Sequence, residues 1–428
     1  MTLPEEDEIP TEDLEAAFLP KSISPEFQAS ARKKTFAPWH HPVKQIVRDL
    51  QWGVLTKRLV SQRPPGMQVL RYFTLPGADL LDVRVLADVC SDFKVQIEYF
   101  GFNSGWGPNA ESSNEAGVES ARAAWADAEA ALRQAGKITP YAEVASDRLE
   151  DIAVQTSNAR ASLSRKPIFD VINIDACDHL AYRPAGRERN TFDALVALLQ
   201  HQIKATAPWL LFVTTRAEPD LLGVPGVALM QAISRNITSA PEFVPALAGL
   251  IGCGEGAIFT HVVDTWKKTG EAFLKLYGLG VAKYLLQYFL QQPNCPANVE
   301  LASIFAYRVH GDSPNMAALA FLITPDPVRA FLPNSGSLPT PASLEPKRAC
   351  AAASRAGRLL NIDSTLETNR AMFKKAVNST EALLGSANYD ISAWREWVQT
   401  HPTRPMSLSG LTQAGNSSKG SQEACSSE

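Results

Sequence analysis

Two short apolar runs that end in polar residues constrain this chain most. Residues 95–103 read VQIEYFGFN, and residues 169–178 read FDVINIDACD. Each run has the length of a strand that is buried on both faces, and each delivers polar side chains where it ends. In open α/β sheets, ligands bind at the edge where the carboxyl ends of the parallel strands meet. The two runs therefore predict a parallel sheet with a polar site at that edge.

The segments around these runs alternate between strand and helix patterns. Strand patterns lie at 69–74, 95–102, 141–145, 169–174 and 209–214. Helix patterns lie at 42–59, 79–90, 115–134, 148–165 and 191–205. Two later strand patterns, 301–309 and 317–323, are joined by a short loop, which is typical of an antiparallel pair. This order predicts a Rossmann-like, doubly wound α/β sheet of seven mostly parallel strands, with an antiparallel final pair.

The composition divides the chain into one main domain and its flanks. We expect the domain at 36–330, with a helical insertion at 222–292. A flexible acidic arm at 1–35 precedes it, and a linker with a helical extension follows at 331–400. The Ser/Gly/Gln-rich tail at 401–428 has the composition of a disordered segment.

Charge and cysteine content exclude several classes of protein. The net charge of −4 gives no global attraction to nucleic acid. The six cysteines are scattered without metal-ligand spacing, which predicts reduced thiols, no metal site and a cytoplasmic protein. No run reaches 18 apolar residues, and the N-terminus is acidic, so we expect neither a membrane span nor a signal peptide.

Between residues 36 and 324, the order of elements resembles the class I S-adenosylmethionine-dependent methyltransferase superfamily. That family has five alternating strands followed by an antiparallel pair, and a Gly-rich loop after its first strand carries the methionine part of the cofactor. The matching segment here is 75–82, LPGADLLD, which offers the single glycine Gly77. Residues 39–45, WHHPVKQ, are also similar to an uncharacterised group of bacterial methyltransferase-like proteins.

The resemblance implies S-adenosylmethionine as cofactor and a set of site residues. Gly77 would contact its methionine part, Asn103 would stand where the family usually has a ribose-binding acid, and Asp147 would face the adenine. Asp175 and Asp178 would line the transfer site, where a carboxylate beside an apolar strand could act as a base. The alternatives are that Asp178 caps the following turn and that the cofactor site is degenerate.

Four arginines follow the fourth and fifth strands, and they suggest a polyanionic substrate. They are Arg183, Arg187, Arg189 and Arg216. Loops at the carboxyl edge usually carry substrate contacts, so we expect nucleic acid as the substrate. Ordinary loop solubility is an equally weighted alternative.

The helix that precedes the first strand carries two cations one turn apart. Lys44 and Arg48 could form a basic stripe, but a solvated helix face is the stronger expectation. His40 and His41 are expected to cap this helix, with Pro42 in its first turn.

The sequence therefore predicts a methyltransferase. The alternative is a catalytically degenerate methyltransferase fold that acts as a binding or regulatory module for partner proteins. The single glycine and the amide of Asn103 at the ribose position favour that alternative. A nicotinamide-dependent enzyme is a weaker hypothesis, because no Gly-x-Gly-x-x-Gly follows the first strand.

Overall fold

The computed structural model describes residues 32–64, 66–106, 115–292, 295–326 and 341–400. The expected tail at 401–428 and most of the expected arm at 1–35 lie outside these residues.

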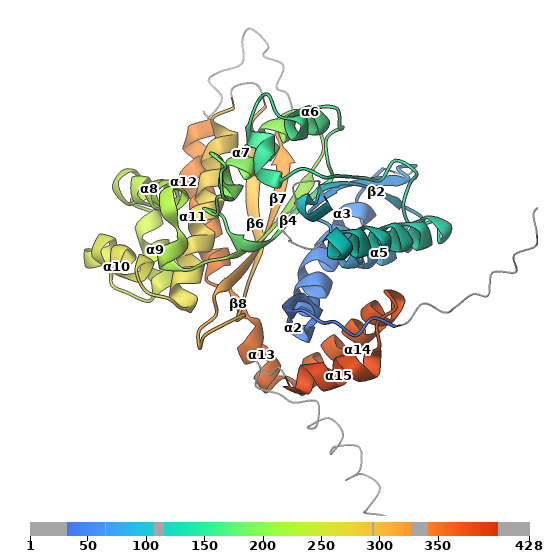
Figure 1. Cartoon of the computed structure of the whole chain (residues 1–428). Helices are drawn as coiled ribbons and strands as arrows, with labels where there is room; N and C mark the ends of the chain where they lie inside the picture. Colours follow the sequence, from blue (N-terminus) through green and yellow to red (C-terminus); the bar gives the residue numbers. More distant parts are fainter. Residues whose placement is uncertain (1–31, 65, 107–114, 293–294, 327–340, 401–428) are drawn as a thin grey trace, which may run out of the picture.

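One eight-stranded sheet runs through the molecule, in the order β3-β2-β1-β4-β5-β7-β6-β8 (Figure 1). The strands are β1 (Val69–Thr74), β2 (Gln96–Phe102), β3 (Glu143–Ala145), β4 (Val171–His179), β5 (Trp209–Arg216), β6 (Ala297–Tyr307), β7 (Met316–Pro325) and β8 (Leu360–Asn361). Neighbouring described strands are parallel except where β7 pairs with β5 and with β6. The predicted α/β fold, the mostly parallel sheet and the antiparallel final pair are thus confirmed. The two-residue strand β8 was not predicted.

The strand order reverses between β1 and β4. From β1 the chain moves outward to β2 and β3, then returns to β4 on the other side of β1 and continues to β5. Such a reversal opens a crevice at the carboxyl ends of the two central strands, where open α/β sheets bind their ligands. The fold therefore places the expected site at the carboxyl ends of β1 and β4.

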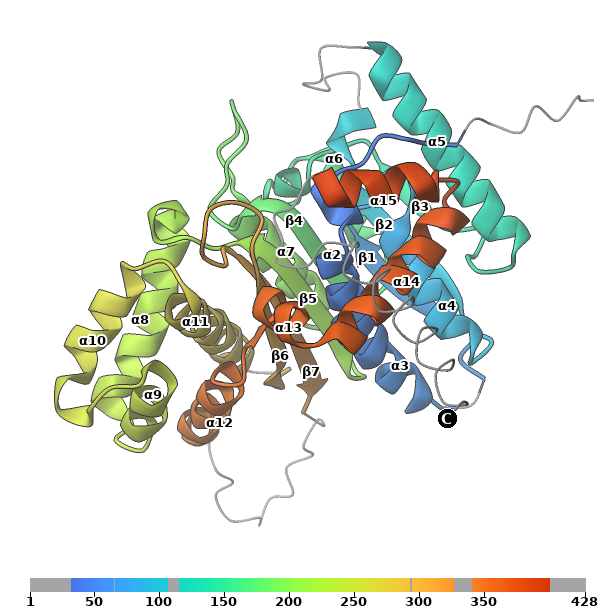
Figure 2. The same ribbon diagram turned by 90° about the horizontal axis from the view of Figure 1, so that it is seen from below.

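Helices cover both faces of the sheet (Figure 2). On one face lie α6 (Asn158–Ser164), α7 (Thr191–Gln202), α8 (Gly223–Ser239), α9 (Phe243–Ile251), α10 (Ile258–Trp266), α11 (Glu271–Leu290) and α12 (Pro341–Ala356). On the other lie α2 (Pro42–Ile46), the π-helix η2 (Val47–Gly53), α3 (Val54–Ser61), α4 (Leu81–Ser91), α5 (Glu115–Gln134), α13 (Ile362–Thr368), α14 (Arg370–Ser386) and α15 (Ile391–Thr400). Short 3-10 helices are η1 (Pro38–His40), η3 (Ser104–Trp106), η4 (Leu149–Ala153), η5 (Pro219–Leu221) and η6 (Glu255–Ala257).

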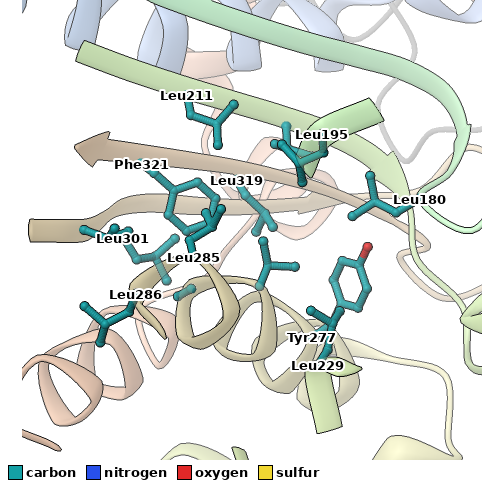
Figure 3. Packing of buried hydrophobic residues seen from close by; sticks show 14 of the residues in the cluster. Leu180, Leu195, Leu211, Leu229, Tyr277, Leu285, Leu286, Leu301, Leu319 and Phe321 are labelled. Carbon is teal, nitrogen blue, oxygen red and sulfur yellow. The ribbon is translucent and has the colours of Figure 1, made fainter. Parts of the chain in front are cut away.

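Burial on both faces explains why the strands read as continuous apolar runs. In β5, Leu211 faces the layer that contains α11, while Leu210 and Phe212 face the layer that contains α3. Figure 3 shows how α11 packs Leu285 against the sheet beside Phe321. Helix α11 is apolar nearly all round because α8 and α12 cover its other sides.

Four expected elements differ in the structure. The helix predicted at 148–165 is instead η4 followed by α6, and the side chain of Ser157 caps α6 by accepting the N–H of Arg160 at 3.0 Å. Strands β4 and β5 run beyond their predicted ends, to His179 and Arg216. Helix α12 begins at Pro341, inside the segment predicted as linker, and the C-terminal helices pack back onto α2, α4 and α11.

Within the described residues, no single helix has both the length and the apolar character needed to cross a membrane. One bent pair, Phe243–Ile251 with Glu255–Trp266, meets those criteria only when taken together, and its two parts are bent by 92°.

Candidate functional site

A cluster of polar side chains lies at the reversal point of the strand order, on the face covered by α2, η2 and α4. We call it the switch-point cluster. Its members are Lys44, Arg48, Gln51, Tyr72, Thr74, Asp82, Asn173, Asp175, Thr214 and Tyr307. It joins the helix before β1 to the carboxyl halves of β1, β4 and β5.

Alternate residues of β4 supply two of these side chains. Because β4 continues to His179, Asn173 and Asp175 share one face, as the alternation in the sequence suggested. Asn173 Nδ2 donates to the hydroxyl of Tyr72 at 3.0 Å, and Asp175 pairs with Lys44 Nζ. Both side chains therefore point toward the α2 layer.

The helix before β1 supplies the cations of the cluster. Lys44 is 5% exposed and Arg48 is 4% exposed, so the expected solvated helix face is wrong. The physical reason is that the facing sheet is polar at this end, so Lys44 is buried against the carboxylate of Asp175 and Arg48 against neutral acceptors instead of facing water. The chain from Val47 to Gly53 has π-helical hydrogen bonding, a rare geometry that recurs at functional sites.

Lys44 and Asp175 form the central ion pair of the cluster. Lys44 Nζ also lies 4.9 Å from the ring centre of Trp52 and 5.9 Å from that of Tyr307. Burial, the largest single effect, lowers the pKa of Lys44, but the attraction and hydrogen bond of Asp175 together with the attraction of Tyr307 outweigh it and raise the pKa above that of an ordinary lysine. Asp175, expected at the transfer site, thus lies in the carboxyl half of β4, where its carboxylate is paired with Lys44.

Asp82 was not predicted as a site residue, although it lies in the first turn of α4 directly after the β1 loop. It accepts hydrogen bonds from Tyr72 at 2.8 Å and from Thr74 Oγ1 at 2.5 Å. Burial raises the pKa of the Asp82 carboxyl in spite of these bonds. The sequence pattern that could have identified Asp82 is an acidic residue in the first turn of a helix that follows a strand.

The loop after β1 and the end of β2 carry two of the expected cofactor residues. A Cβ added at Gly77 would meet no heavy atom of the described residues within 4 Å, so its backbone is open to approach. Asn103 Nδ2 donates to the carbonyl of Pro76 at 2.8 Å, and its Oδ1 accepts the N–H of Gly105 at 3.0 Å. Asn103 therefore holds the β1 loop against β2, which leaves one amide hydrogen for a ligand.

Gly101 permits this close approach of the two strand ends. A Cβ at this position would lie 2.4 Å from the carbonyl oxygen of Thr74 and 2.7 Å from Pro76 Cδ. We expect Gly101→Ala to lower the free energy of unfolding by about 1–3 kcal/mol, because backbone has to move, and urea unfolding would measure it. Gly77→Ala is the matched control, with an expected change within about 0.5 kcal/mol. Equal effects of the two substitutions would contradict this packing.

Asp147 lies two residues beyond Ala145, the last residue of β3, whose carbonyl accepts the N–H of Asn103. Burial and the neighbouring Asp151 raise the pKa of Asp147, while Arg187 opposes the shift. Arg187 itself lies 3.2 Å from an oxygen of Asp151. One of the expected substrate arginines is thus bound to η4.

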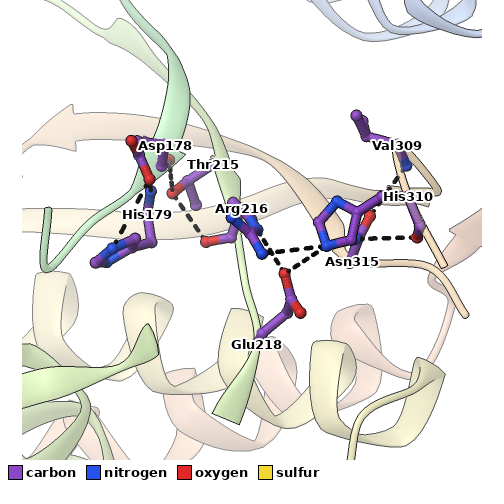
Figure 4. A network of polar contacts seen from close by, with 8 residues as sticks. All are labelled: Asp178, His179, Thr215, Arg216, Glu218, Val309, His310 and Asn315. Carbon is purple, nitrogen blue, oxygen red and sulfur yellow. Dashed lines mark hydrogen bonds and ion pairs between the residues drawn. The ribbon is translucent and has the colours of Figure 1, made fainter. Parts of the chain in front are cut away.

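The ends of β4 and β5 form a separate polar network (Figure 4). Asp178 Oδ1 accepts the N–H of His179, and its carbonyl oxygen accepts from Thr215 Oγ1 at 2.9 Å. Arg216 Nε donates to Glu218 at 2.5 Å. Asp178 and Arg216 thus lie at the predicted edge, but the remaining expected arginines, Arg183 and Arg189, are on exposed loop positions.

Two histidines in this region were missed by sequence reasoning. His310 Nε2 lies 3.1 Å from a guanidinium nitrogen of Arg216 and 2.8 Å from Asn315 Nδ2. His179 lies beside Asp178, with 3.7 Å between Nε2 and Oδ1. His310 comes from the loop between β6 and β7, so its approach to β5 was not readable from local sequence.

A small pocket opens beside this network. Its polar lining is His179, Arg216 and Glu218, and its remaining walls include Leu222 and Tyr277. No group of three or more His, Cys, Asp or Glu side chains in the described chain is placed to hold a metal ion.

The two ends of the described chain meet over the β1 loop. Lys33 pairs with Asp79, and the hydroxyl of Tyr389 donates to the same carboxylate at 2.6 Å. His40 is buried here, and burial lowers its pKa to about 4. His41 is the residue before α2, as predicted, but its side chain makes no capping hydrogen bond to that helix.

Comparison with known proteins gives one finding. A family model described as PP_RS20740-like matches residues 33–399, which is most of the chain. None of the curated proteins matches the sequence.

Proposed function

The chain belongs to the PP_RS20740-like family, and from that premise we propose that it is an S-adenosylmethionine-dependent methyltransferase. The description of the family names no activity, so the proposal is argued from the fold and the site. The observation that carries it is the sheet order, in which five parallel strands are followed by the β6–β7 pair and only β7 is antiparallel among the described strands. This is the element order that the sequence resemblance implied, and polar side chains gather where it reverses.

Residues of the carboxyl edge fit parts of the cofactor. Gly77 leaves open space beside the loop after β1. Asp147 offers a half-buried carboxylate near the end of β3, suited to an amino or hydroxyl group. Among the described residues, Asn103 donates one amide hydrogen to Pro76 and accepts from Gly105, so its second amide hydrogen is the donor it can offer to a ligand. When bound, the cofactor supplies an activated methyl group.

The chain would bind and orient the acceptor at the ends of β4 and β5. Asp178 is the less constrained of the two expected transfer-site carboxylates, since Asp175 is paired with Lys44. Leu222 and Tyr277 wall the adjacent pocket and would keep water away from the reacting atoms. Catalysis would then depend mainly on alignment of the acceptor.

Nucleic acid remains the acceptor class to test first, with weaker support than the sequence suggested. Arg187 is paired with Asp151 and Arg216 with Glu218, which reduces the free positive charge. Arg183 and Arg189 are exposed and could contact phosphate.

Calorimetric titration with S-adenosylmethionine and S-adenosylhomocysteine tests the proposal. We expect micromolar dissociation constants and an affinity about tenfold lower in Asp147→Asn, because a charged hydrogen bond is lost. Asp92→Asn, on the surface and paired with Lys57, is the matched control and should bind as wild type. Folded protein that binds neither ligand would overturn the proposal.

A catalytically degenerate module is the second candidate, and two contacts favour it. Asn103 donates a hydrogen bond to Pro76 of the β1 loop, and Asp79 in that loop is held by Lys33 and Tyr389. These side chains are therefore occupied by contacts within the chain. Such a module would recognise a partner protein without transferring a methyl group. Its signature is a folded protein with no affinity for either cofactor form.

A further inference from the structure

Arg48 is a buried cation without a hydrogen-bonded carboxylate among the described residues. One of its terminal nitrogens donates to the carbonyl of Trp39 at 3.0 Å and lies 3.4 Å from Gln45 Oε1, both neutral acceptors. Its Nε has no partner in the described part of the chain. Lys44, one turn earlier, differs in holding Asp175 directly.

Such an arrangement is costly unless something else compensates it. Burial lowers the pKa of Arg48, and the carboxylates of Asp175 and Asp82 counteract it from a distance. A buried guanidinium normally gains its stability from a close, planar anion that accepts two hydrogen bonds. Arg48 therefore lacks, among the described residues, the close anion that a buried guanidinium normally has.

Acceptor atoms in the same cluster also lack donors. They are Asn173 Oδ1, Thr214 Oγ1 and Gln51 Oε1, all buried and unpartnered within the described residues. Thr214 is the β5 partner of Asp175, and Asn173 lies two residues before Asp175 on the same face. Buried polar groups are nearly always satisfied, so several unsatisfied ones in a single cluster indicate a polar occupant.

We propose that the switch-point cluster binds the zwitterionic amino-acid end of a ligand, with its carboxylate on Arg48 and its ammonium on Asn173 and Thr214. This inference rests on the proposed function and names where the methionine part of the cofactor is held. It assigns that role to the helix before β1. The β1 loop offers few groups for this end of the ligand, because it has the single glycine Gly77 and its Asp79 is held by Lys33 and Tyr389.

Two ligands that differ only at the amino-acid end test the inference. S-adenosylhomocysteine carries that end, and 5′-methylthioadenosine lacks it. We expect Arg48→Met to lower the affinity for S-adenosylhomocysteine by about 10- to 100-fold and to leave the affinity for 5′-methylthioadenosine unchanged. Calorimetric titration measures both affinities. Arg58→Met, on the exposed part of α3, is the control and should leave both affinities unchanged. Equal losses for both ligands, or no loss for either, would overturn the inference.

Thr214→Val provides a second test that does not depend on the folding of the Arg48 variant. Because Thr214 Oγ1 has no partner in the described residues, the ligand-free protein should be as stable as wild type or more stable. Binding of S-adenosylhomocysteine should nevertheless fall several-fold, while 5′-methylthioadenosine is unaffected. Unchanged binding of both ligands would count against the inference.

The outcomes separate the inference from the proposed function. If S-adenosylhomocysteine binds and these variants bind it normally, the inference fails and the methyltransferase proposal stands. If it does not bind wild type at all, L-methionine at millimolar concentration is tested by thermal unfolding. Stabilisation of wild type but not of Arg48→Met would then support the amino-acid site without the methyltransferase, and no stabilisation would overturn both.

Discussion

Lys283→Ala is expected to lower the free energy of unfolding by about 3–5 kcal/mol, the usual effect of removing one partner from a buried ion pair. Lys283 lies in the middle of α11 with 0% exposure, and its Nζ pairs with Glu345 of α12. Glu345 also accepts from Asn236 Nδ2 of α8 at 2.8 Å. Without the lysine, this carboxylate would stay largely buried with Asn236 as its one neutral donor in the described part of the chain, so three helices would lose their common polar contact.

Urea unfolding with matched variants measures the effect. Lys275→Met, which breaks the more exposed pair with Glu271 on the same helix, should change stability by no more than about 0.5 kcal/mol. The double variant Lys283→Met with Glu345→Gln removes both charges and keeps an acceptor for Asn236, so it should recover most of the loss. Similar stabilities of Lys283→Ala and Lys275→Met would show that this ion pair is not a stabilising contact.

The strands could be predicted because the sheet is buried on both faces. Apolar runs such as 169–174 then have no competing helical periodicity, and β1 was predicted at Val69–Thr74, the bounds observed. Strand β8 has two residues, too few to produce any pattern. The helix predicted at 148–165 is broken because Ser157 caps a new helix, a local hydrogen bond that composition alone does not reveal.

Part of the site could also be predicted, namely polar residues at strand ends. The partners that are distant in sequence could not be predicted. Asp175 meets Lys44 from the helix before β1, and Arg216 meets His310 from the β6–β7 loop. An amphipathic pattern assigns charged residues to solvent, and only a polar sheet face reverses that assignment for Lys44 and Arg48.

The Lys44–Asp175 pair makes the obvious test of catalysis misleading. Asp175→Ala would leave the ammonium of Lys44 buried without its carboxylate, so we expect stability to fall by about 3–5 kcal/mol whether or not Asp175 takes part in transfer. Lost activity in that variant would then reflect unfolding as readily as chemistry. Lys44→Met with Asp175→Asn removes both charges, and we expect it to restore most of the stability.

The double variant therefore separates the two roles of Asp175. If Asp175 serves only to hold Lys44, the double variant should keep the ligand affinity of wild type as well as its stability. If the carboxylate acts on the ligand, stability should return while ligand binding stays impaired. Single and double variants of equal stability would show that the two side chains are not coupled.

The pair should also leave a signature in the pH dependence of stability. Because Asp175 raises the pKa of folded Lys44 above its unfolded value, the stabilisation is fully present below the ordinary lysine pKa of about 10.4 and is lost as pH rises through the folded pKa. Wild type should therefore lose stability in that alkaline range more steeply than Lys44→Met, in urea unfolding at matched ionic strength. Parallel curves for the two proteins would mean that Lys44 gains no charge stabilisation on folding. The difference between the curves reports Lys44 together with Tyr307, because burial raises the pKa of that tyrosine while Lys44 lowers it, so the loss of Lys44 changes the titration of both groups.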